Sequence, residues 1–327
     1  MSAWKVVVTA RSFSETAVGW KALEAMGATV VRAVPVAGAP APELGQLLSD
    51  ADAAIVGTER IDASILARAD HLKIVVKAGA GVDNIDLLAA RDAGVAVGSV
   101  PGANAGAVAD YAVGLMLAAA RRVCEVDRAV RRGEWSRFLG VDLFGATVGV
   151  LGLGNVGRGV CERLKGFSPT LIGNDVVVDK EWARQVGLEL SSIDQIVERS
   201  DFLSLHLPLT DETRGLIGRD AISRMKPTAV VVNTARGGLV DLDALYDALV
   251  ERRIAGAALD VFPLEPLQDD RFRSLENVVL SSHNASYSND GIDRTVLGAV
   301  QQVEAAFRSR PSSQGENGSA HRPGLPG

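Results

Sequence analysis

The sequence is poor in the residues that build disulfide frameworks and metal sites. Its 327 residues include 2 cysteines and 4 histidines. Cys124 and Cys161 form no C-x-x-C pair and have no histidine beside them. Each is therefore predicted to be a buried thiol and not half of a disulfide or a metal ligand. Zinc-dependent oxidation of a simple alcohol or aldehyde is disfavoured for the same reason, because the sequence holds no Cys/His ligand cluster.

A strong excess of one charge and a long apolar run are also lacking. The formal net charge is -6, from 34 basic and 40 acidic side chains, which gives no basic footprint for nucleic acid or an anionic membrane. The longest apolar block, residues 112–120, is far shorter than the ~20 residues that cross a bilayer. The N-terminal apolar stretch is too short for a secretory signal. We therefore expect a cytoplasmic protein that binds neither nucleic acid nor membranes.

Short apolar runs alternate with helix-like segments along most of the chain. KVVVTA, AAIVG, LKIVVKAG and VAVGS form a first set before residue 100, and ATVGVLGLG, TLIGND, DFLSLHLP, AVVVNTA, IAGAALDVF and NVVLSSH form a second set after it. The alternation is typical of βαβ units and parallel sheets, and almost wholly apolar strands indicate sheets covered on both faces. Because single cores stop growing near ~250 to 300 residues, the sequence predicts two α/β units.

An unusually apolar helix is predicted between the two sets of strands. Residues 104–120 are apolar nearly all round, and a charged stretch follows from Arg121. A helix without a polar face must be buried, either between the two units or in a subunit interface. At the other end, residues 308–327 are rich in Pro, Gly and Ser and are predicted to be a disordered tail, in which His321 is inert.

A glycine-rich loop follows the first strand of the second set. Gly152, Gly154 and Gly157 have the G-x-G-x-x-G spacing. The spacing alone is a weak signal, but here it follows a strand and opens a helix, as a dinucleotide-binding loop requires. The first glycine would permit a tight turn, the second would let backbone amides approach a pyrophosphate, and the third would let the helix pack on the strand.

Asp175 ends the strand that follows the glycine loop. Its spacing from the loop suits a carboxylate that binds the adenosine ribose hydroxyls. It would repel a 2'-phosphate, and no Arg or Lys occurs between it and Lys180. These residues favour NAD over NADP. The alternative is an Asp that only caps the loop after a strand.

Polar residues recur where the later strands end, and ligands of doubly wound sheets bind outside the carboxyl ends of the strands. These residues are His206, Pro208, Asn233, Thr234, Ala235, Arg236, Asp260 and His283. Taken singly, Arg236 would more often cap a helix or lie on the surface, and His283 would more often be a hydrogen-bonded loop residue. Their recurrence in the half of the chain that carries the glycine loop favours a site.

Two of these positions and a nearby carboxylate have the chemistry for reducing a carbonyl group. Arg236 precedes two glycines and is free to reach a small anionic or carbonyl-bearing substrate. Glu265 lies in a loop restrained by two prolines, and if it reaches His283 it would favour the imidazolium and fix the tautomer. His283 would then supply the proton that hydride transfer to a carbonyl requires.

Together these segments resemble the D-isomer-specific 2-hydroxyacid dehydrogenase family. The resemblance runs from about residue 5 to residue 308 and is closest to D-3-phosphoglycerate dehydrogenases in a short form without a regulatory domain. It is carried by GVDNIDLLAARDAGVAVGSVPGANAGAVADYAVGLMLAAAR, LGLGNVGRGV, HLPLTDETRGLIG, MKPTAVVVNTARGGLVDLDALYDAL, GAALDVFPLEP and the final histidine.

The resemblance implies two doubly wound parallel-sheet domains with a cleft between them. A flavodoxin-like substrate domain would comprise residues 1–99 and 290–307, and a Rossmann NAD-binding domain would comprise residues 100–289. Family members usually dimerise through the nucleotide-binding domains, so the resemblance also implies a homodimer that uses the apolar helix.

The resemblance further implies roles for single residues. Arg236 would bind the substrate, His283 would be the acid/base with Glu265 as its partner, and Asp260 would hold the nicotinamide carboxamide. The remaining matches to cofactor-binding positions are Gly152, Gly154, Asn155, Val156, Gly157, Asp175, His206, Pro208, Thr213, Thr234, Ala235 and His283 itself. The substrate-binding positions, besides Arg236 and His283, are Lys77, Ala80, Gly81 and Asn104.

Two departures from the family pattern bear on the substrate. Gly57 stands where phosphoglycerate enzymes commonly have an arginine that contacts the phosphate, while Lys77 and Arg137 remain candidate anion contacts. Ser282 precedes His283 in place of the usual proline. These departures weaken a phosphorylated substrate more than they weaken dehydrogenase chemistry.

Two hypotheses follow from the sequence. The first is an NAD-dependent oxidoreductase that interconverts a small D-2-hydroxy acid, or a phosphate or phosphonate analogue, with the oxo compound. The second is an NAD(H)-sensing binding protein, because corepressors similar to these enzymes keep the same motifs, including a histidine followed shortly by Tyr-Ser as in HNASYS. Intact Arg236, Glu265 and His283 favour the enzyme.

Overall fold

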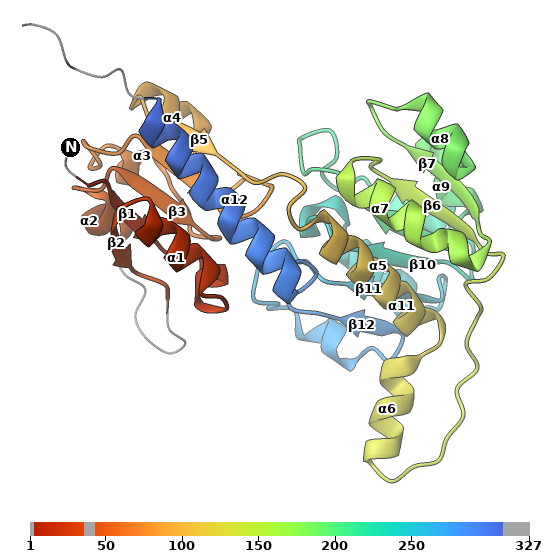
Figure 1. Cartoon of the computed structure of the whole chain (residues 1–327). Helices are drawn as coiled ribbons and strands as arrows, with labels where there is room; N and C mark the ends of the chain where they lie inside the picture. Colours follow the sequence, from red (N-terminus) through yellow and green to blue (C-terminus); the bar gives the residue numbers. More distant parts are fainter. Residues whose placement is uncertain (1–2, 36–42, 310–327) are drawn as a thin grey trace, which may run out of the picture.

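The computed structural model describes residues 3–35 and 43–309, which form two parallel β-sheets covered by helices (Figure 1). The order of the first sheet is β2-β1-β3-β4-β5, and that of the second is β12-β11-β10-β9-β6-β7-β8. All strand pairings are parallel. The prediction of two doubly wound parallel-sheet units is confirmed.

The strands are short and follow the apolar runs of the sequence. Their bounds are β1 Lys5–Val8, β2 Thr29–Arg32, β3 Ala53–Val56, β4 Ile74–Lys77, β5 Ala96–Gly98, β6 Thr147–Leu151, β7 Thr170–Asn174, β8 Leu188–Leu190, β9 Phe202–Leu205, β10 Val230–Asn233, β11 Gly256–Leu259 and β12 Val278–Leu280.

Helices connect the strands, and an Asp or Ser side chain caps the start of many of them. The α-helices are α1 Val18–Ala25, α2 Leu44–Leu48, α3 Ala63–Leu66, α4 Leu87–Asp92, α5 Ala105–Ala120, α6 Val123–Arg131, α7 Asn155–Leu164, α8 Lys180–Val186, α9 Ile193–Arg199, α10 Arg219–Ser223, α11 Leu242–Val250 and α12 Asn289–Arg308. Four 3-10 turns complete the set: η1 Arg11–Ser14, η2 Lys165–Phe167, η3 Gly237–Leu239 and η4 Asp270–Ser274.

Both faces of the first sheet are buried, which explains why its inner strands read as continuous apolar runs. Successive residues of a strand point to opposite faces. Val6 and Val8 of β1 accordingly belong to one hydrophobic cluster, and Val7 belongs to another. The first cluster is completed by α12, which runs back across the first sheet (Figure 1) and adds Ile292, Val296, Ala299, Val300 and Val303.

Helix α12 lies where the family resemblance places residues 290–307, against the first sheet. The division of the chain into residues 1–99 with 290–307, and residues 100–289, stays a prediction. The helix ends at Arg308, and most of the predicted tail, with His321, lies outside the described residues.

The apolar helix α5 is largely buried, as predicted, but mainly within the second unit, whereas the sequence predicted burial between the two units or in a subunit interface. It packs against α7 and the second sheet, and its fully buried Met116 belongs to the hydrophobic cluster of that sheet. The helix stops at Ala120, and Arg122 takes a left-handed conformation with φ 52° before α6 begins. Helix α6 and the segment after it project from the body (Figure 1) and expose Trp135 and Leu139, at 88% and 93%.

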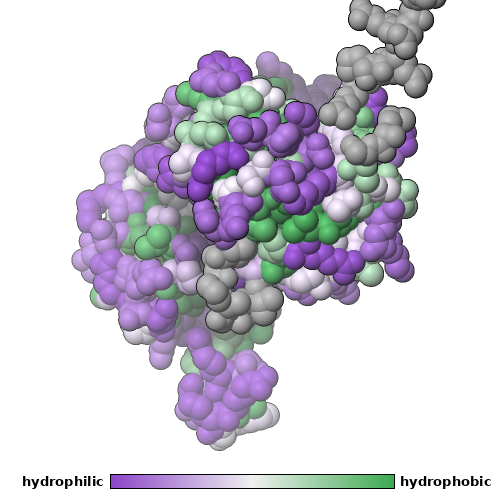
Figure 2. All heavy atoms as spheres, turned by 90° about the vertical axis from the view of Figure 1, so that its left-hand side faces the viewer, coloured by the Kyte–Doolittle hydropathy of each residue, from purple (hydrophilic) through white to green (hydrophobic). Residues whose placement is uncertain are grey.

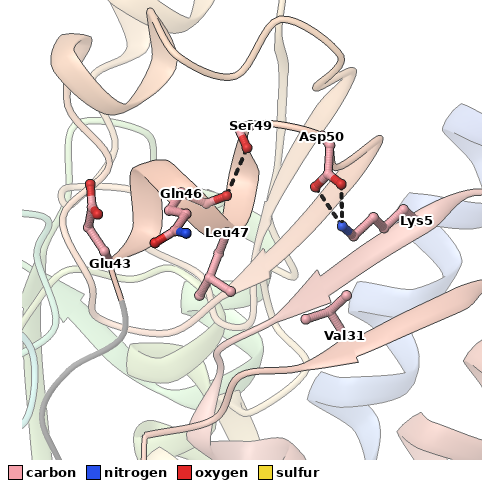
Figure 3. Close-up of a pocket in the computed structure, with 7 residues that line it drawn as sticks. All are labelled: Lys5, Val31, Glu43, Gln46, Leu47, Ser49 and Asp50. Atoms are coloured by element: carbon pink, nitrogen blue, oxygen red, sulfur yellow. Dashed lines mark hydrogen bonds and ion pairs between the residues drawn. The ribbon is translucent and has the colours of Figure 1, made fainter.

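The described residues contain no helix that is both long and apolar enough to cross a membrane. The face of the molecule shown in Figure 2 is mostly hydrophilic, with smaller hydrophobic areas between the polar side chains. Figure 3 shows a hollow beside α2 at the outer edge of the first sheet, where Lys5 pairs with Asp50. It holds none of the predicted site residues.

Candidate functional site

The predicted residues of the second sheet lie next to one another where its strands end. Backbone hydrogen bonds continue past the strands: Gly152 N donates to Asn174 O at 2.9 Å, and His206 N donates to Leu151 O at 2.7 Å. Further along the sheet, Asp260 N donates to Asn233 O at 2.9 Å. These bonds align the residues that follow β6, β9, β10 and β11 along one edge of the sheet, as a doubly wound fold requires.

The three glycines of the loop between β6 and α7 have different steric surroundings. Gly152 has φ 95°, and a Cβ there would lie 2.5 Å from the backbone carbonyl of His206. A Cβ at Gly157 would lie 1.9 Å from Gly152 O. At Gly154, by contrast, a Cβ would have no described atom within 4 Å. The first and third glycines are therefore needed for packing, and the second faces open space at the start of α7, where backbone amides favour an anion.

Asp175 is fixed beside the glycine loop. Its Oδ2 accepts a hydrogen bond from Leu153 N at 2.6 Å, and its Oδ1 accepts one from Val177 N at 3.2 Å. Arg158, in the first turns of α7, pairs with Asp179 at 3.2 Å and lies over the Trp182 ring. The guanidinium of Arg158 thus has other partners, and the carboxylate of Asp175 remains available to hydroxyl groups.

His206 is suited to a structural role more than to proton transfer. Its Nε2 lies 2.8 Å from Ser204 Oγ. Burial lowers the pKa of His206 to about 4, so its ring is neutral at physiological pH. In the loop that follows, Thr213 Oγ1 donates to Pro208 O at 2.7 Å and accepts from Thr210 N at 2.8 Å. Pro208 and Thr213 therefore order this loop together.

Thr234 and Ala235 follow β10. Thr234 is 8% exposed, and its Oγ1 has no hydrogen-bond partner within the part of the chain that the structure describes. A buried hydroxyl without a partner is costly, so its position suits a polar group of a ligand. Ala235 N donates to Asn233 Oδ1 at 3.0 Å, and Asn233 Nδ2 donates to Arg236 O at 2.9 Å, which fixes the backbone of the turn.

Arg236 reaches from the second sheet to the loop that follows β4 of the first sheet. Its Nε donates to Asp83 Oδ2 at 2.7 Å, and a Cβ at Gly81 would lie 1.9 Å from its Nη2. Gly81 must therefore be a glycine for the guanidinium to lie there. The N–H groups of Ala80 and Gly81 donate to no described group, so the guanidinium lies beside a loop with two free amides. This arrangement suits a carboxylate.

His283 is held in place by Glu265 and Asp260. His283 has φ 55°, and its backbone N donates to Asp260 O at 2.7 Å. The Asp260 carboxylate is fully buried and accepts Asn284 N at 2.7 Å and Ala285 N at 2.9 Å. Asp260 is therefore a positioning residue for the His283 loop, and its role toward a nicotinamide stays a prediction.

Glu265 orients the ring of His283. Its Oε2 lies 2.7 Å from His283 Nδ1, and its Oε1 accepts Phe262 N at 3.0 Å. Burial raises the pKa of Glu265, but the hydrogen bonds from His283 and Phe262 and the nearby charge of Arg236 outweigh it, so this pKa lies below its ordinary value. A carboxylate at Nδ1 requires the proton on that nitrogen, which directs Nε2 outward as the working atom.

The remaining predicted substrate contacts are placed differently. The Lys77 ammonium donates to Gly57 O, and burial lowers the pKa of Lys77 although Glu59 opposes this. Asn104 precedes α5 at its N-terminal end and is partly buried. Arg137 is exposed on the segment that follows α6, on the projecting part of the chain.

Sequence reasoning missed Asp83, the ion-pair partner of Arg236. Asp83 lies in the same KAGAGVDN loop as Ala80 and Gly81, so a carboxylate beside a predicted arginine contact was the available signal. Both cysteines are free thiols, but only Cys161 is buried as predicted; Cys124 is partly exposed, which corrects the prediction for it. Burial raises the pKa of Cys161 to about 12. In the described ranges, no three His, Cys, Asp or Glu side chains gather as a metal site would require.

The architecture and the glycine turn place the chain in the class of dinucleotide-binding α/β proteins. Residues 113–285 match the family model described as D-isomer specific 2-hydroxyacid dehydrogenase, NAD binding domain. The chain belongs to this family, which confirms the resemblance seen in the sequence, and its second sheet lies in the family's NAD-binding domain.

Known relatives differ in the reaction for which they are named. The chain is 41% identical to a D-3-phosphoglycerate dehydrogenase of Methanocaldococcus jannaschii over 81% of its own length, but it spans about half of that relative, 52%. It is 43% identical to a glyoxylate reductase of Korarchaeum cryptofilum, over 74% of this chain and 76% of the relative. The TT0316 protein of Thermus thermophilus has a similar structure, with a TM-score of 0.85 and 33% identity over 94% of this chain and 97% of that one.

Proposed function

We propose that this chain is an NAD-dependent dehydrogenase that interconverts a small D-2-hydroxy acid and its 2-oxo acid. The observation that carries the proposal is the His283–Glu265 pair, 2.7 Å apart, at the same edge of the sheet as an arginine that lies beside a loop with two free amides. A proton carrier and a carboxylate-binding arginine are the two protein groups that this reaction requires.

The residues present fit a dinucleotide. The open position at Gly154 leaves room at the start of α7 for a pyrophosphate. The hydroxyl of Thr234, which has no partner among the described residues, offers the dinucleotide a further hydrogen bond. Asp175, bonded to the glycine loop, would hold the adenosine ribose and disfavour a 2'-phosphate. When bound, the nicotinamide supplies or accepts the hydride.

The chain's own residues orient the substrate and move the proton. Arg236 binds the carboxylate and polarises the carbonyl, and the amides of Ala80 and Gly81 complete the carboxylate contact. His283 Nε2 donates the proton to the carbonyl oxygen during reduction and takes it back during oxidation. Glu265 stabilises the imidazolium, and Asp83 keeps the guanidinium extended toward the substrate loop.

A turnover assay with a matched binding assay tests the proposal. NADH oxidation would be followed with glyoxylate, pyruvate, hydroxypyruvate, 3-phosphohydroxypyruvate and phosphonopyruvate, with NADPH in parallel. We expect NADH-dependent reduction that His283→Ala abolishes while NADH binding, measured by fluorescence, is unchanged. Tight NADH binding without turnover of any acid would contradict the enzyme and favour the NAD-sensing alternative.

We also propose a homodimer formed through the side of the second unit that carries α5 and α6. The projecting segment exposes Trp135, Leu139 and Phe144, and a set of large exposed apolar side chains is typical of an interaction surface. Analytical ultracentrifugation would show a dimer, and Trp135→Ser with Leu139→Ser would shift it to the monomer. A monomeric wild type would contradict the proposal. The cytoplasmic location stays a prediction.

A further inference from the structure

We propose that Glu59 restricts the substrate to 2-oxo acids whose only anionic group is the carboxylate, and that acids with a terminal phosphate or phosphonate are rejected. The inference rests on the proposed function, since it concerns the substrate of the same site.

Glu59 is fixed in the turn that follows β3, beside the loop that follows β4. Its Oε2 accepts Gly57 N at 2.6 Å. Asn84 Nδ2 donates to Glu59 O at 2.6 Å and to Gly57 O at 3.2 Å. The Lys77 ammonium donates to the same Gly57 carbonyl. These bonds hold the turn after β3 against the loop that follows β4, and they keep the Glu59 carboxylate beside that loop.

Gly57 provides the room for this carboxylate. A Cβ at Gly57 would lie 3.1 Å from Glu59 Oε2 and 3.5 Å from Ala10 Cα. The first contact is tight, so a long side chain at this position would displace Glu59. The absence of a side chain at Gly57 therefore leaves the space that the negatively charged carboxylate of Glu59 occupies.

The charges at this edge already compensate one another. Arg236 pairs with Asp83, Lys77 lies near Glu59, and the exposed Arg60 lies 4.0 Å from Asp62, so each of these three cations has a carboxylate near it. The substrate carboxylate takes up the charge of Arg236. A second anionic group, further along the substrate, would meet Glu59 and a lysine already bonded to a backbone carbonyl. Like charges placed together at a binding site strongly disfavour the complex.

The experiment compares kcat/KM for hydroxypyruvate and 3-phosphohydroxypyruvate with NADH. Glu59→Gln removes the charge but keeps an oxygen that accepts Gly57 N–H. We expect the wild type to prefer hydroxypyruvate, and Glu59→Gln to raise kcat/KM for the phosphorylated acid about tenfold, through KM, because one opposing charge is lost. Activity with hydroxypyruvate should change less than about twofold on the same electrostatic argument. The matched control is Glu24→Gln, in α1, where Glu24 pairs with Arg32, and it should change neither value.

Salt provides a test that does not depend on a variant. Higher ionic strength screens Glu59, so the wild-type preference for hydroxypyruvate should narrow as salt rises, and it should narrow less in Glu59→Gln. A wild type that prefers the phosphorylated acid, or a preference that neither salt nor Glu59→Gln alters, would overturn the role of Glu59 and leave the proposed function intact. Bound NADH without turnover of any 2-oxo acid of the panel would overturn the proposed function, and this inference with it.

Discussion

Replacing Asp260 by Asn should loosen the loop that carries His283. The Asp260 carboxylate is 0% exposed and accepts two backbone N–H groups, from Asn284 at 2.7 Å and from Ala285 at 2.9 Å. An asparagine keeps one acceptor oxygen and turns an NH2 group toward the second N–H. One charge-assisted bond is lost and one buried N–H is left unpaired, which costs about 2 kcal/mol in the free energy of unfolding.

The consequence for catalysis follows from the backbone of His283. A φ of 55° is uncommon for a histidine and persists because the surrounding contacts impose it. With the loop released, the ring leaves Glu265 for part of the time, and kcat/KM should fall on the order of tenfold or more, since small misplacements of a catalytic group are costly.

Urea unfolding and steady-state kinetics measure the two effects separately. The matched control is Asp290→Asn, which changes an exposed carboxylate at the start of α12 that makes no side-chain hydrogen bond to described residues. It should change the free energy of unfolding by less than about 0.5 kcal/mol. If Asp260→Asn unfolds at the wild-type urea concentration with wild-type kcat/KM, Asp260 does not position the loop. Lower stability with unchanged kinetics would limit Asp260 to a structural role.

Three further predictions concern other parts of the site. Glu265→Gln should lower kcat about 100-fold, by loss of the group that orients the proton carrier. Because the pKa of Glu265 lies below its ordinary value, this carboxylate should stabilise the wild type at pH values above the ordinary glutamate pKa, and the stabilisation should be lost as the pH falls through the lowered pKa. Urea midpoints at neutral and acid pH should show this loss in the wild type and less of it in Glu265→Gln. Arg236→Lys keeps the charge but loses the fork that reaches Asp83, so KM for the 2-oxo acid should rise about tenfold while NADH affinity stays constant; an unchanged KM would count against a carboxylate contact. Gly157→Ala should destabilise the fold, since its Cβ would lie 1.9 Å from a carbonyl oxygen. Gly154→Ala should fold normally but weaken NADH binding about tenfold. Thermal melts and NADH titration distinguish the two variants, and equal behaviour of both would contradict the steric difference between the two glycines.

The sequence predicts the elements that depend on local pattern. The inner strands of both sheets could be recognised because burial on both faces makes them continuous apolar runs. The glycine loop could be recognised because its spacing occurs between a predicted strand and a predicted helix. Strand β2 is partly exposed, and two of the three residues of β8 are exposed, one of them Glu189, so neither stands out as an apolar run. The break between α5 and α6 depends on the left-handed backbone of Arg122, which an arginine does not signal.

Some contacts within the site could be predicted from the sequence, and others could not. The Glu265–His283 contact joins residues 18 positions apart that follow the neighbouring strands β11 and β12, and the prolines beside Glu265 pointed to it. The Arg236–Asp83 pair joins residues 153 positions apart and exists only because the two units face each other. The hold of Asp260 on Asn284 and Ala285 depends on the exact turn after β12, which a pattern of residue types does not specify.

The return of α12 to the first sheet determines the order in which the two units can finish folding during translation. Val6 and Val8 leave the ribosome early, but the side chains that cover them, Val296 and Val300 among others, leave it only after the whole second sheet has been made. Domains generally fold as units as they emerge, so the second unit can fold first, while one face of the first sheet stays uncovered. A chain cut before residue 289 should therefore bind a hydrophobic dye that the full chain excludes.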